Sequence, residues 1–204
     1  TPTSGSIVFE GKPIAGRRPD EVTRAGIART FQNIRLFGDM TVWENLLVGR
    51  HSRLKQNVFD DIFSTAKKRR EESLAREMLE NLLKQFRMEK LRDELAKNLP
   101  YGLQRELEIM RAMASEPRLL MLDEPAAGMN PQETDQLMLQ IKRLKELGFT
   151  VLVVEHDMKL VMNICDKITV LNYGKKIAEG VPCEIQAHPE VIGAYLGKQV
   201  KDSA

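Results

Sequence analysis

The sequence predicts an α/β fold with a central, mostly parallel sheet, an edge β-hairpin and a helical subdomain. Two apolar segments, 119–122 and 150–154, support this prediction, because each contains four consecutive apolar residues and then stops at charged residues. Such segments are typical of buried strands in a parallel sheet. An amphipathic segment at 132–147 separates them, and strands that alternate with helices in this way form parallel sheets through right-handed crossovers.

The N-terminal part predicts a short edge hairpin followed by a helix and a strand. Residues 6–10 alternate as a strand, the chain turns at Gly11-Lys12, and it returns at Pro13-Ile14. A helix is expected to begin at Pro19 and to end near Gly26, because proline suits the first helical turn. Further strands are expected at 27–31, 167–171 and 175–179, and further helices at 158–164, 182–187 and 189–196.

The middle of the chain is predicted to be helical and strongly charged. Thr41 and Glu44 have the spacing of a capping box, which predicts a helix over 42–48. A longer helical pattern covers 58–95, and another helix is expected at 105–114. The apolar stripe of the long pattern consists of Leu74, Met78, Leu79, Leu82, Leu83 and Phe86.

Composition narrows the class of protein. The 204 residues contain 31 Lys and Arg against 29 Asp and Glu, so the net charge of +2 gives no reason to expect nucleic acid as the main partner. The basic run at 67–70 is neutralised by the glutamates that follow it, which favours a solvated helix face. Cys165 and Cys183 lack metal-ligand spacing and suit a reducing compartment. With neither a signal peptide nor an apolar run of membrane-spanning length, we expect a soluble intracellular protein.

Polar residues follow each predicted parallel strand. Asp123 and Glu124 end the strand at 119–122, His156 follows the strand at 150–154, and Gln32 follows the strand at 27–31. Ligands of open α/β sheets bind at the carboxyl ends of the strands. One carboxylate there can hold Mg²⁺, and a second can orient a water for attack on a phosphate. Taken singly, each of these residues is also compatible with an ordinary strand-to-loop transition, and for Gln32 and His156 alone that interpretation is the more common one.

The segment 99–104, which reads LPYGLQ, breaks the helical pattern just before the helix expected at 105–114. A turn that leads into a helix presents backbone N–H groups, and these groups together with the helix dipole favour an anion such as phosphate. The alternative is a loop that simply enters a helix.

In this order and spacing, the motifs RTFQNIRLF, LLMLDE, AAGMNP and VVEHD resemble the nucleotide-binding subunit of ATP-binding-cassette (ABC) transporters over essentially the whole chain. Their counterparts are the glutamine loop, the Walker B strand, the D-loop and the switch histidine. The resemblance implies a P-loop NTPase-like ABC cassette in three parts. Residues 1–36 would be the remainder of the N-terminal catalytic core, 37–98 the helical subdomain, and 99–204 the signature helix, the rest of the core and a C-terminal tail.

Longer matches indicate one branch of this family. The stretches RTFQNIRLFGDMTVWENLLVG, EPAAGMNP, EHDMKLVM and HPEVIGAYLG resemble the ATPases of branched-chain amino acid importers, in particular the type with the longer helical insertion. The AYLG tail also resembles the cassette that powers lipopolysaccharide export, which is similar over less of the chain. Two further alternatives are a non-hydrolysing docking module and a soluble cassette ATPase that works on DNA or ribosomes.

The resemblance implies ATP and Mg²⁺ as cofactors and gives each site residue a role. Asp123 would hold Mg²⁺ through water, and Glu124 would act as the general base that polarises the attacking water. His156 would contact the γ-phosphate, and Gln32 would meet the metal or the water. Phosphoryl transfer depends on positioning and charge neutralisation, which these residue types supply.

The resemblance also implies partners. Tyr101 and Gly102 would face the γ-phosphate of a nucleotide held by a second ATP-binding subunit, identical or different, so that two subunits sandwich ATP. Membrane permease subunits would dock near the glutamine loop, where Leu36, Phe37 and Trp43 either line a groove or pack in the core. A substrate-binding protein would take part indirectly. No nucleic acid is expected, and the subunit would lie peripherally on the cytoplasmic face of the inner membrane.

The sequence departs from the family pattern at several positions. Pro100 replaces the signature serine, Glu106 stands where a basic residue is usual, Met110 where alanine is usual, and Asn130 where the D-loop has aspartate. No Gly-x-x-x-x-Gly-Lys-Ser/Thr motif occurs in the sequence, so the phosphate-cradling loop is missing. In the family this loop precedes the point where the present chain begins. We therefore expect a fragment of a working ATPase that, by itself, binds ATP very weakly and hydrolyses none.

Overall fold

A computed structural model describes residues 2–51 and 66–196 of the chain. They divide into two compact units. Unit 1 consists of Thr1–Met129 and Leu144–Val154, and unit 2 of Asn130–Arg143 and Glu155–Ala204. The division of the cassette at residues 36 and 98, which the family resemblance implies, stays a prediction.

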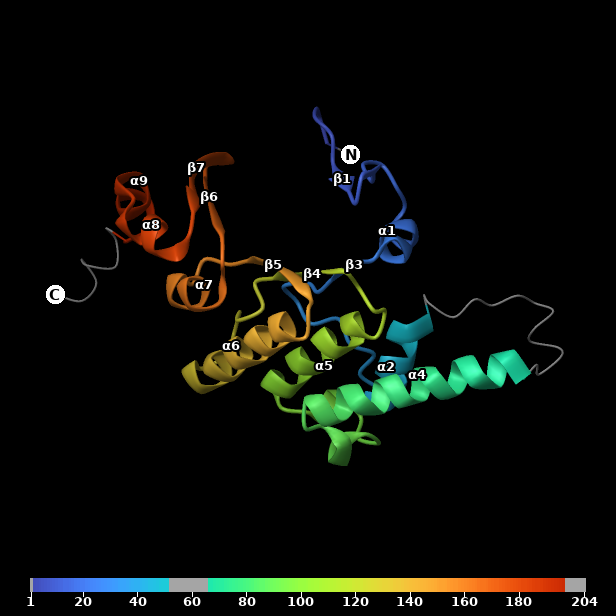
Figure 1. The fold of residues 1–204 in the computed structure, drawn as a ribbon. Coiled ribbons are helices and arrows are strands. Elements are labelled where there is room, and N and C mark those ends of the chain that lie inside the picture. Colours follow the sequence, from blue (N-terminus) through green and yellow to red (C-terminus); the bar gives the residue numbers. More distant parts are fainter. Residues whose placement is uncertain (1, 52–65, 197–204) are drawn as a thin grey trace. The chain divides into compact units, whose positions relative to one another are not determined.

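Unit 1 is built on a parallel sheet of three strands (Figure 1). The strands are β3 (Ile27–Arg29), β4 (Leu119–Asp123) and β5 (Thr150–Val154), in the order β3-β4-β5. In register, Leu119 of the central strand lies opposite Ile27 on one side and Thr150 on the other. The parallel sheet predicted from the two apolar segments is therefore confirmed. Side chains alternate across β4, so that Leu120 and Leu122 are buried in the core.

Three helices of unit 1 form its helical layer (Figure 1). They are α2 (Val42–His51), α4 (Ala66–Gln85) and α5 (Tyr101–Met113). The predicted capping box is confirmed at the start of α2, where the Thr41 N–H donates to Glu44 Oε2 at 2.8 Å and the Glu44 N–H donates to Thr41 Oγ1 at 3.1 Å. The helix runs to His51, three residues beyond its predicted end.

The start of α5 differs from the prediction. This helix begins at Tyr101 instead of Arg105, with the extended Pro100 as its N-cap. The Gln104 N–H donates to the Pro100 carbonyl at 3.0 Å, which closes the first turn. Gly102 made the segment look like a turn in the sequence. Glycine does not prevent a helix from forming there, because the backbone that proline fixes at Pro100 lets the helix begin at the next residue. Tyr101 and Gly102 thus lie inside the helix.

The long helical pattern predicted for 58–95 is only partly right. Residues 58–65 lie outside the described residues, and α4 ends at Gln85, two residues before Arg87 takes a left-handed backbone with φ of +57°. Two 3₁₀ turns follow, at Glu89–Leu91 and Ala96–Asn98. Of the predicted stripe, Leu74 is 55% exposed, because helical spacing identifies a face but not the length over which other elements cover it. The buried members are Leu79, Leu82, Leu83 and Phe86.

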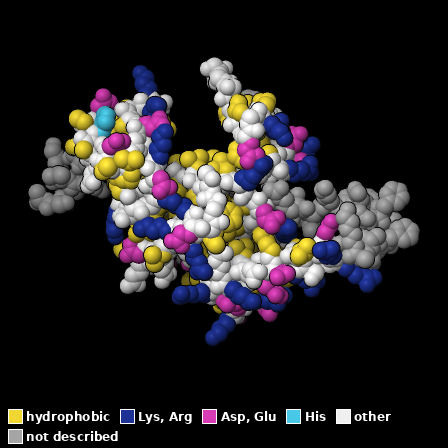
Figure 2. Space-filling view, viewed as in Figure 1, with side chains coloured by type: hydrophobic (Ala, Val, Ile, Leu, Met, Phe, Trp, Pro, Cys, Tyr) yellow, Lys and Arg dark blue, Asp and Glu magenta, His cyan; other side chains and the backbone are white. Residues whose placement is uncertain are grey.

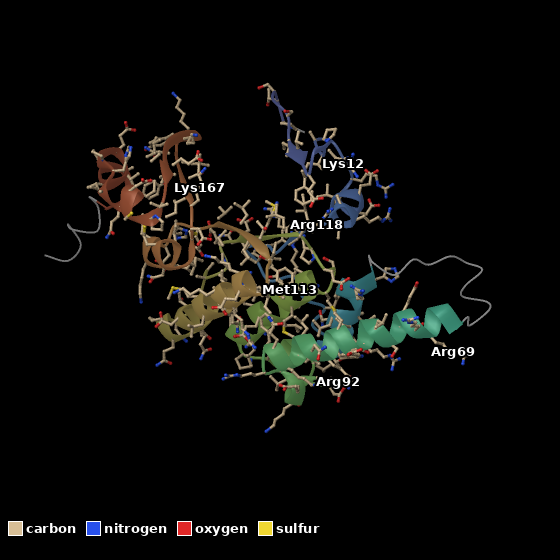
Figure 3. All side chains as sticks on the ribbon, viewed as in Figure 1. Lys12, Arg69, Arg92, Met113, Arg118 and Lys167 are labelled. Atoms are coloured by element: carbon tan, nitrogen blue, oxygen red, sulfur yellow. The ribbon has the colours of Figure 1, made fainter. Side chains whose placement is uncertain are left out.

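The N-terminal hairpin pairs β1 (Val8–Phe9) with β2 (Lys12–Pro13), as predicted. Its turn lies at Glu10-Gly11, one residue earlier than expected, and both residues have positive φ, as a type I′ turn requires. Helix α1 (Pro19–Ala25) follows. The side chain of Arg118 donates to the Ala25 carbonyl at 2.6 Å and pairs with Glu10, so it joins α1 to the hairpin (Figure 3).

Unit 2 has a small core of its own, formed by Val161, Ile168, Ala178, Ile185 and Val191. Its elements include most of α6 (Pro131–Glu146), then α7 (Met158–Ile164), the antiparallel pair β6 (Ile168–Asn172) and β7 (Lys175–Gly180), α8 (Pro182–Ala187), α9 (Pro189–Val191) and a π-helix (Ile192–Leu196). The helix predicted for 189–196 is thus divided into two forms.

The surface carries both signs of charge. Figure 2 shows Lys and Arg side chains interspersed with Asp and Glu on the face in view, in keeping with the net charge of +2. Within residues 2–51 and 66–196, no helix combines the length and the apolar character needed to cross a bilayer.

Candidate functional site

The candidate site begins where β4 ends. Asp123 is the last residue of this strand, and Glu124 follows with a left-handed backbone at φ of +43°. The Glu124 N–H donates to the Val154 carbonyl at 2.9 Å, which fixes this bend against the end of β5. A residue with a Cβ adopts this conformation at a cost, and such residues cluster at functional sites.

The structure brings Gln32 and Glu124 together. Strand β3 is the parallel neighbour of β4, and the Thr30 N–H extends their ladder by donating to the Met121 carbonyl at 2.9 Å. Two residues further on, Gln32 Nε2 donates to Glu124 Oε2 at 2.8 Å. The residues that follow two neighbouring parallel strands thus meet at one edge of the sheet.

Asp123 has a different partner. Its Oδ2 atom accepts a hydrogen bond from Arg29 Nη2 at 2.5 Å, and Arg29 is the last residue of β3. The guanidinium groups of Arg29 and Arg35 also lie over the Phe31 ring, 5.3 and 4.6 Å from its centroid. A cationic side chain therefore neutralises the carboxylate that the sequence assigns to Mg²⁺.

The same edge offers oxygen ligands of the kind that Mg²⁺ prefers. Asp123 and Glu124 supply carboxylates, and Gln32 supplies an amide oxygen. Among the described residues, no three His, Cys, Asp or Glu side chains form a group that could hold a metal by themselves. Mg²⁺ in nucleotide sites is usually bound by one or two carboxylates together with phosphate oxygens and waters. These residues fit a nucleotide-bound Mg²⁺ better than a metal held by protein alone.

The backbone around Gln32 is held from inside the protein. Arg105, fully buried in α5, donates from Nη1 to the Phe31 carbonyl at 2.7 Å and from Nη2 to the Gln32 carbonyl at 2.6 Å. Glu108, one turn further along α5, pairs with Arg105 at 2.8 Å and accepts the Arg35 N–H at 3.2 Å. We call residues 31–35 the Gln32 loop.

The end of this region is anchored to α2. The buried Asn45 accepts the Phe37 N–H at Oδ1, at 3.0 Å, and donates from Nδ2 to the Phe37 carbonyl at 3.1 Å. The Gln32 loop is thus bounded by α5 on one side and by α2 on the other.

Burial lowers the pKa of Arg111, another α5 arginine, whose guanidinium lies 5.4 Å from the centroid of the Phe37 ring.

Tyr101 and Gly102 lie in the first turn of α5. The Tyr101 hydroxyl donates to the Ala127 carbonyl at 2.8 Å, within the segment that follows Glu124. Gly128 has φ of +77°, and a Cβ there would lie only 3.3 Å from the Tyr101 hydroxyl, so glycine suits this close approach. The first turn of α5 therefore contacts the loop that carries the AAGMNP motif.

His156 belongs to unit 2. Its side chain is 75% exposed, and its Nδ1 atom lies 3.8 Å from Oε2 of Glu155, a side chain that is only 2% exposed. Glu155 Oε2 also accepts the His156 N–H at 3.0 Å. Asp157 caps α7 by accepting the Leu160 N–H at 3.1 Å. The predicted meeting of His156 with the γ-phosphate stays a prediction.

Sequence reasoning missed four residues that organise this site: Arg29, Asn45, Arg105 and Glu108. Arg105 and Glu108 left a usable signal, because opposite charges three residues apart on a helix are neighbours, and this pair is followed by the apolar Ile109 and Met110. Arg29 and Asn45 left no such signal, since their partners come from distant parts of the chain or from backbone carbonyls.

Two acidic residues at the end of a parallel strand, met by the glutamine that follows the neighbouring strand, are the arrangement expected of a nucleotide-binding α/β cassette. The chain belongs to the ABC transporter ATP-binding family. The family model described as "ABC transporter" matches residues 1–127, and a second model, "Branched-chain amino acid ATP-binding cassette transporter", matches residues 175–201.

Two bacterial relatives are similar over almost the whole chain. The high-affinity branched-chain amino acid transport ATP-binding protein BraF of Pseudomonas aeruginosa is 48% identical over 198 residues, which cover 97% of this chain and 78% of BraF. The corresponding protein LivG of Escherichia coli is 44% identical, with the same coverage. Among solved structures, the ADP conformation of MJ1267, an ATP-binding cassette of an ABC transporter, matches with a TM-score of 0.77 and 29% identity, over 96% of this chain and 78% of MJ1267.

Proposed function

We propose that this chain is the ATP-hydrolysing subunit of an importer for branched-chain amino acids. The observation that most strongly supports ATP hydrolysis is the 2.8 Å contact between Gln32 and Glu124 beside Asp123, at the carboxyl edge of a parallel sheet. The relatives BraF and LivG carry branched-chain amino acid transport in their names and resemble nearly the whole chain, which supports the substrate class.

In the proposed reaction, Glu124 accepts the proton of the water that attacks the γ-phosphate. Asp123 would hold Mg²⁺ through water, and the ion would supply charge neutralisation on the phosphate oxygens. Gln32 would orient the water or the metal, and His156 would contact the γ-phosphate. Glu124 suits this role because its N–H is held by the Val154 carbonyl, while its side chain accepts a hydrogen bond from the neutral amide of Gln32.

Binding of nucleotide requires that two contacts be exchanged. Arg29 must release Asp123 for the carboxylate to act on Mg²⁺, and Gln32 must release Glu124 for the water to approach. Both contacts are exposed, so each contributes little to stability and can be replaced by water or phosphate. We infer that they hold the two acids in position in the absence of nucleotide.

The lack of a Gly-x-x-x-x-Gly-Lys-Ser/Thr motif in the 204 residues bears on activity. Without the backbone amides and the lysine of this loop, the β- and γ-phosphates lose their main ligands. We propose that the chain as given binds ATP very weakly and hydrolyses none by itself. Micromolar binding of Mg-ATP to the purified chain, measured by calorimetry, would refute this.

The proposed partners are membrane permease subunits and a second ATP-binding subunit, with a substrate-binding protein acting indirectly and no nucleic acid. Phe37, two residues beyond the Gln32 loop, is 46% exposed, and Leu47 and Val48 of α2 are each 39% exposed. These side chains supply apolar surface that a permease helix could cover. Tyr101 and Gly102 would face the nucleotide of the second subunit. We place the assembled subunit at the cytoplasmic face of the inner membrane.

A transport experiment tests the proposal. A chimera in which the P-loop segment of an ABC cassette precedes Thr1 is expressed in an E. coli strain that lacks LivG, and uptake of labelled leucine is measured. Restored uptake is the expected result, with arginine uptake as the specificity control. If the chimera folds and binds ATP but restores no leucine uptake, the proposed substrate class is wrong.

A further inference from the structure

We propose that Arg105 and Glu108 of α5 are positioning residues, which hold the backbone of the Gln32 loop so that the Gln32 side chain reaches Glu124. The catalytic importance of the contact between Gln32 and Glu124 rests on the proposed function, whereas the contact itself is observed in the structure. It assigns a role in the site to a buried ion pair that lies away from the reacting atoms.

The pair makes three contacts with the loop, and all three are with main-chain atoms. The two ends of the Arg105 guanidinium donate to the carbonyls of Phe31 and Gln32 at 2.7 and 2.6 Å. Glu108 accepts the Arg35 N–H at 3.2 Å. One rigid, planar fork therefore spans two successive peptide groups, and the carboxylate holds a third peptide group further along the loop.

Because Arg105 and Glu108 are buried, their contacts determine the position of the loop backbone. Arg105 is 0% exposed and Glu108 is 2% exposed, so neither can exchange its protein partners for water. A buried charge that loses a partner keeps the cost of its desolvation. The loop backbone cannot move away from α5 without depriving both charges of their main-chain partners, and this fixes the position of the Gln32 peptide.

The backbone and the side chain of Gln32 are therefore held by different partners. Its carbonyl is fixed by Arg105 inside the protein, whereas its exposed side chain donates to Glu124 at 2.8 Å. The side chain can exchange Glu124 for another acceptor while the residue stays in place. An ordinary core ion pair would support α5 alone and would leave the exposed loop independent of it.

Arg50 provides a matched comparison. It is also largely buried, pairs with a glutamate, Glu116, and donates to a main-chain carbonyl, that of Ala114, at 3.4 Å. Its partners lie after α5 and away from the Gln32 loop. Substitution of Arg50 therefore disturbs a similar set of contacts in the same unit without touching residues 31–35.

The test is amide hydrogen exchange of the nucleotide-free chain, resolved for residues 30–36 and for β4. The variants are Arg105→Lys and Arg105→Met, with Arg50→Lys and Arg50→Met as controls. We expect exchange at 30–36 to rise by roughly tenfold in R105K, because one charge-assisted bond is lost, and by more in R105M. Exchange in β4 should rise no more than it does in the Arg50 variants.

Equal exchange at residues 30–36 in R105K and R50K would overturn the proposal. If R105M does not fold, R105K decides the matter. Failure of both Arg105 variants to fold, while both Arg50 variants fold, would assign the pair to core support and would also overturn it. Because no nucleotide is present, a failure of the proposed ATPase function would leave this result unaffected.

Discussion

Two glutamates contact the Gln32 loop, and they do so in opposite ways. Glu108 is 2% exposed, ion-paired with Arg105, and accepts a backbone N–H of the loop. Glu124 lies at the end of β4 on a left-handed backbone and accepts the Gln32 side chain. The Glu108 carboxylate stabilises the backbone of the loop. The Glu124 carboxylate lies beside the loop, on a residue whose left-handed backbone is strained.

The difference fits the general-base role that we propose for Glu124. A carboxylate that is to accept a proton must be able to exchange its partners, so its contacts must be weak. The order of the Gln32 loop then has to come from other contacts, and here it comes from the buried charges of Arg105 and Glu108, which bind main-chain atoms of the loop. Removal of the two glutamates should therefore have opposite effects on stability.

The largest expected effect follows from Glu108→Ala. Arg105 would remain buried without its counter-charge, and we expect the free energy of unfolding of unit 1 to fall by about 3–5 kcal/mol. Urea denaturation followed through the fluorescence of Trp43, the single tryptophan, measures it. The control is Glu116→Ala, which removes an exposed partner of Arg50 and should cost less than about 1 kcal/mol. If Glu108→Ala and Glu116→Ala lower the free energy of unfolding equally, the buried Glu108 has no special structural role.

The next effect has the opposite sign. Glu124→Gly is expected to raise the free energy of unfolding by about 1 kcal/mol, because a residue with a Cβ is strained in the left-handed region. Arg87→Gly is the matched control, since the exposed Arg87 has φ of +57° and no part in the site. The same urea titration applies to both. A loss of stability in the Glu124 variant, with a gain in the Arg87 variant, would show that the carboxylate stabilises the fold.

Gln32→Ala should change stability by no more than about 0.5 kcal/mol, because it removes one exposed side-chain contact and leaves the loop backbone on Arg105. The melting temperature of the chain, measured calorimetrically, is the observable. A much larger loss would mean that the side chain, and not the backbone, holds this loop.

Glu179 in unit 2 extends the comparison to a surface carboxylate with two lysine partners. Hydrogen bonds and charge from Lys167 and Lys176 lower its pKa from 4.5 to about 2. Since the folded pKa is depressed, the stabilisation is complete above about pH 4.5 and is lost as the pH falls through about 2. A carboxyl titration by ¹³C NMR should show this midpoint, and Lys167→Met should raise it. An unshifted midpoint in the wild-type chain would contradict the pairing.

Much of the fold could be predicted from local patterns. The strands at the centre of the sheet, the capping box at Thr41 and the stop at Gly26 all depend on residues close together in the sequence. The start of α5 was misjudged because glycine near Pro100 resembles a turn. The exposure of Leu74 could not be predicted, because periodicity does not say where the covering elements end.

The site was predictable only in part. The motifs LLMLDE and RTFQ identified Asp123, Glu124 and Gln32, and parallel pairing of their strands explains why two of these side chains meet. Arg29 left no local signature, because its carboxylate partner comes from a distant segment. The charge spacing of Arg105 and Glu108 could have indicated their ion pair, but it could not indicate that Arg105 binds main-chain carbonyls of a distant loop. Such contacts depend on tertiary structure, which no short motif encodes.

We propose that Glu124, which accepts a hydrogen bond from Gln32, is the group that activates water for ATP hydrolysis. The most direct test is the steady-state ATPase rate of the P-loop chimera with and without Glu124→Gln, together with binding of ATP to both. We expect the glutamine variant to bind ATP but to hydrolyse it at least roughly 100-fold more slowly, since a general base contributes at least that factor. Hydrolysis at the wild-type rate in the glutamine variant would contradict the account.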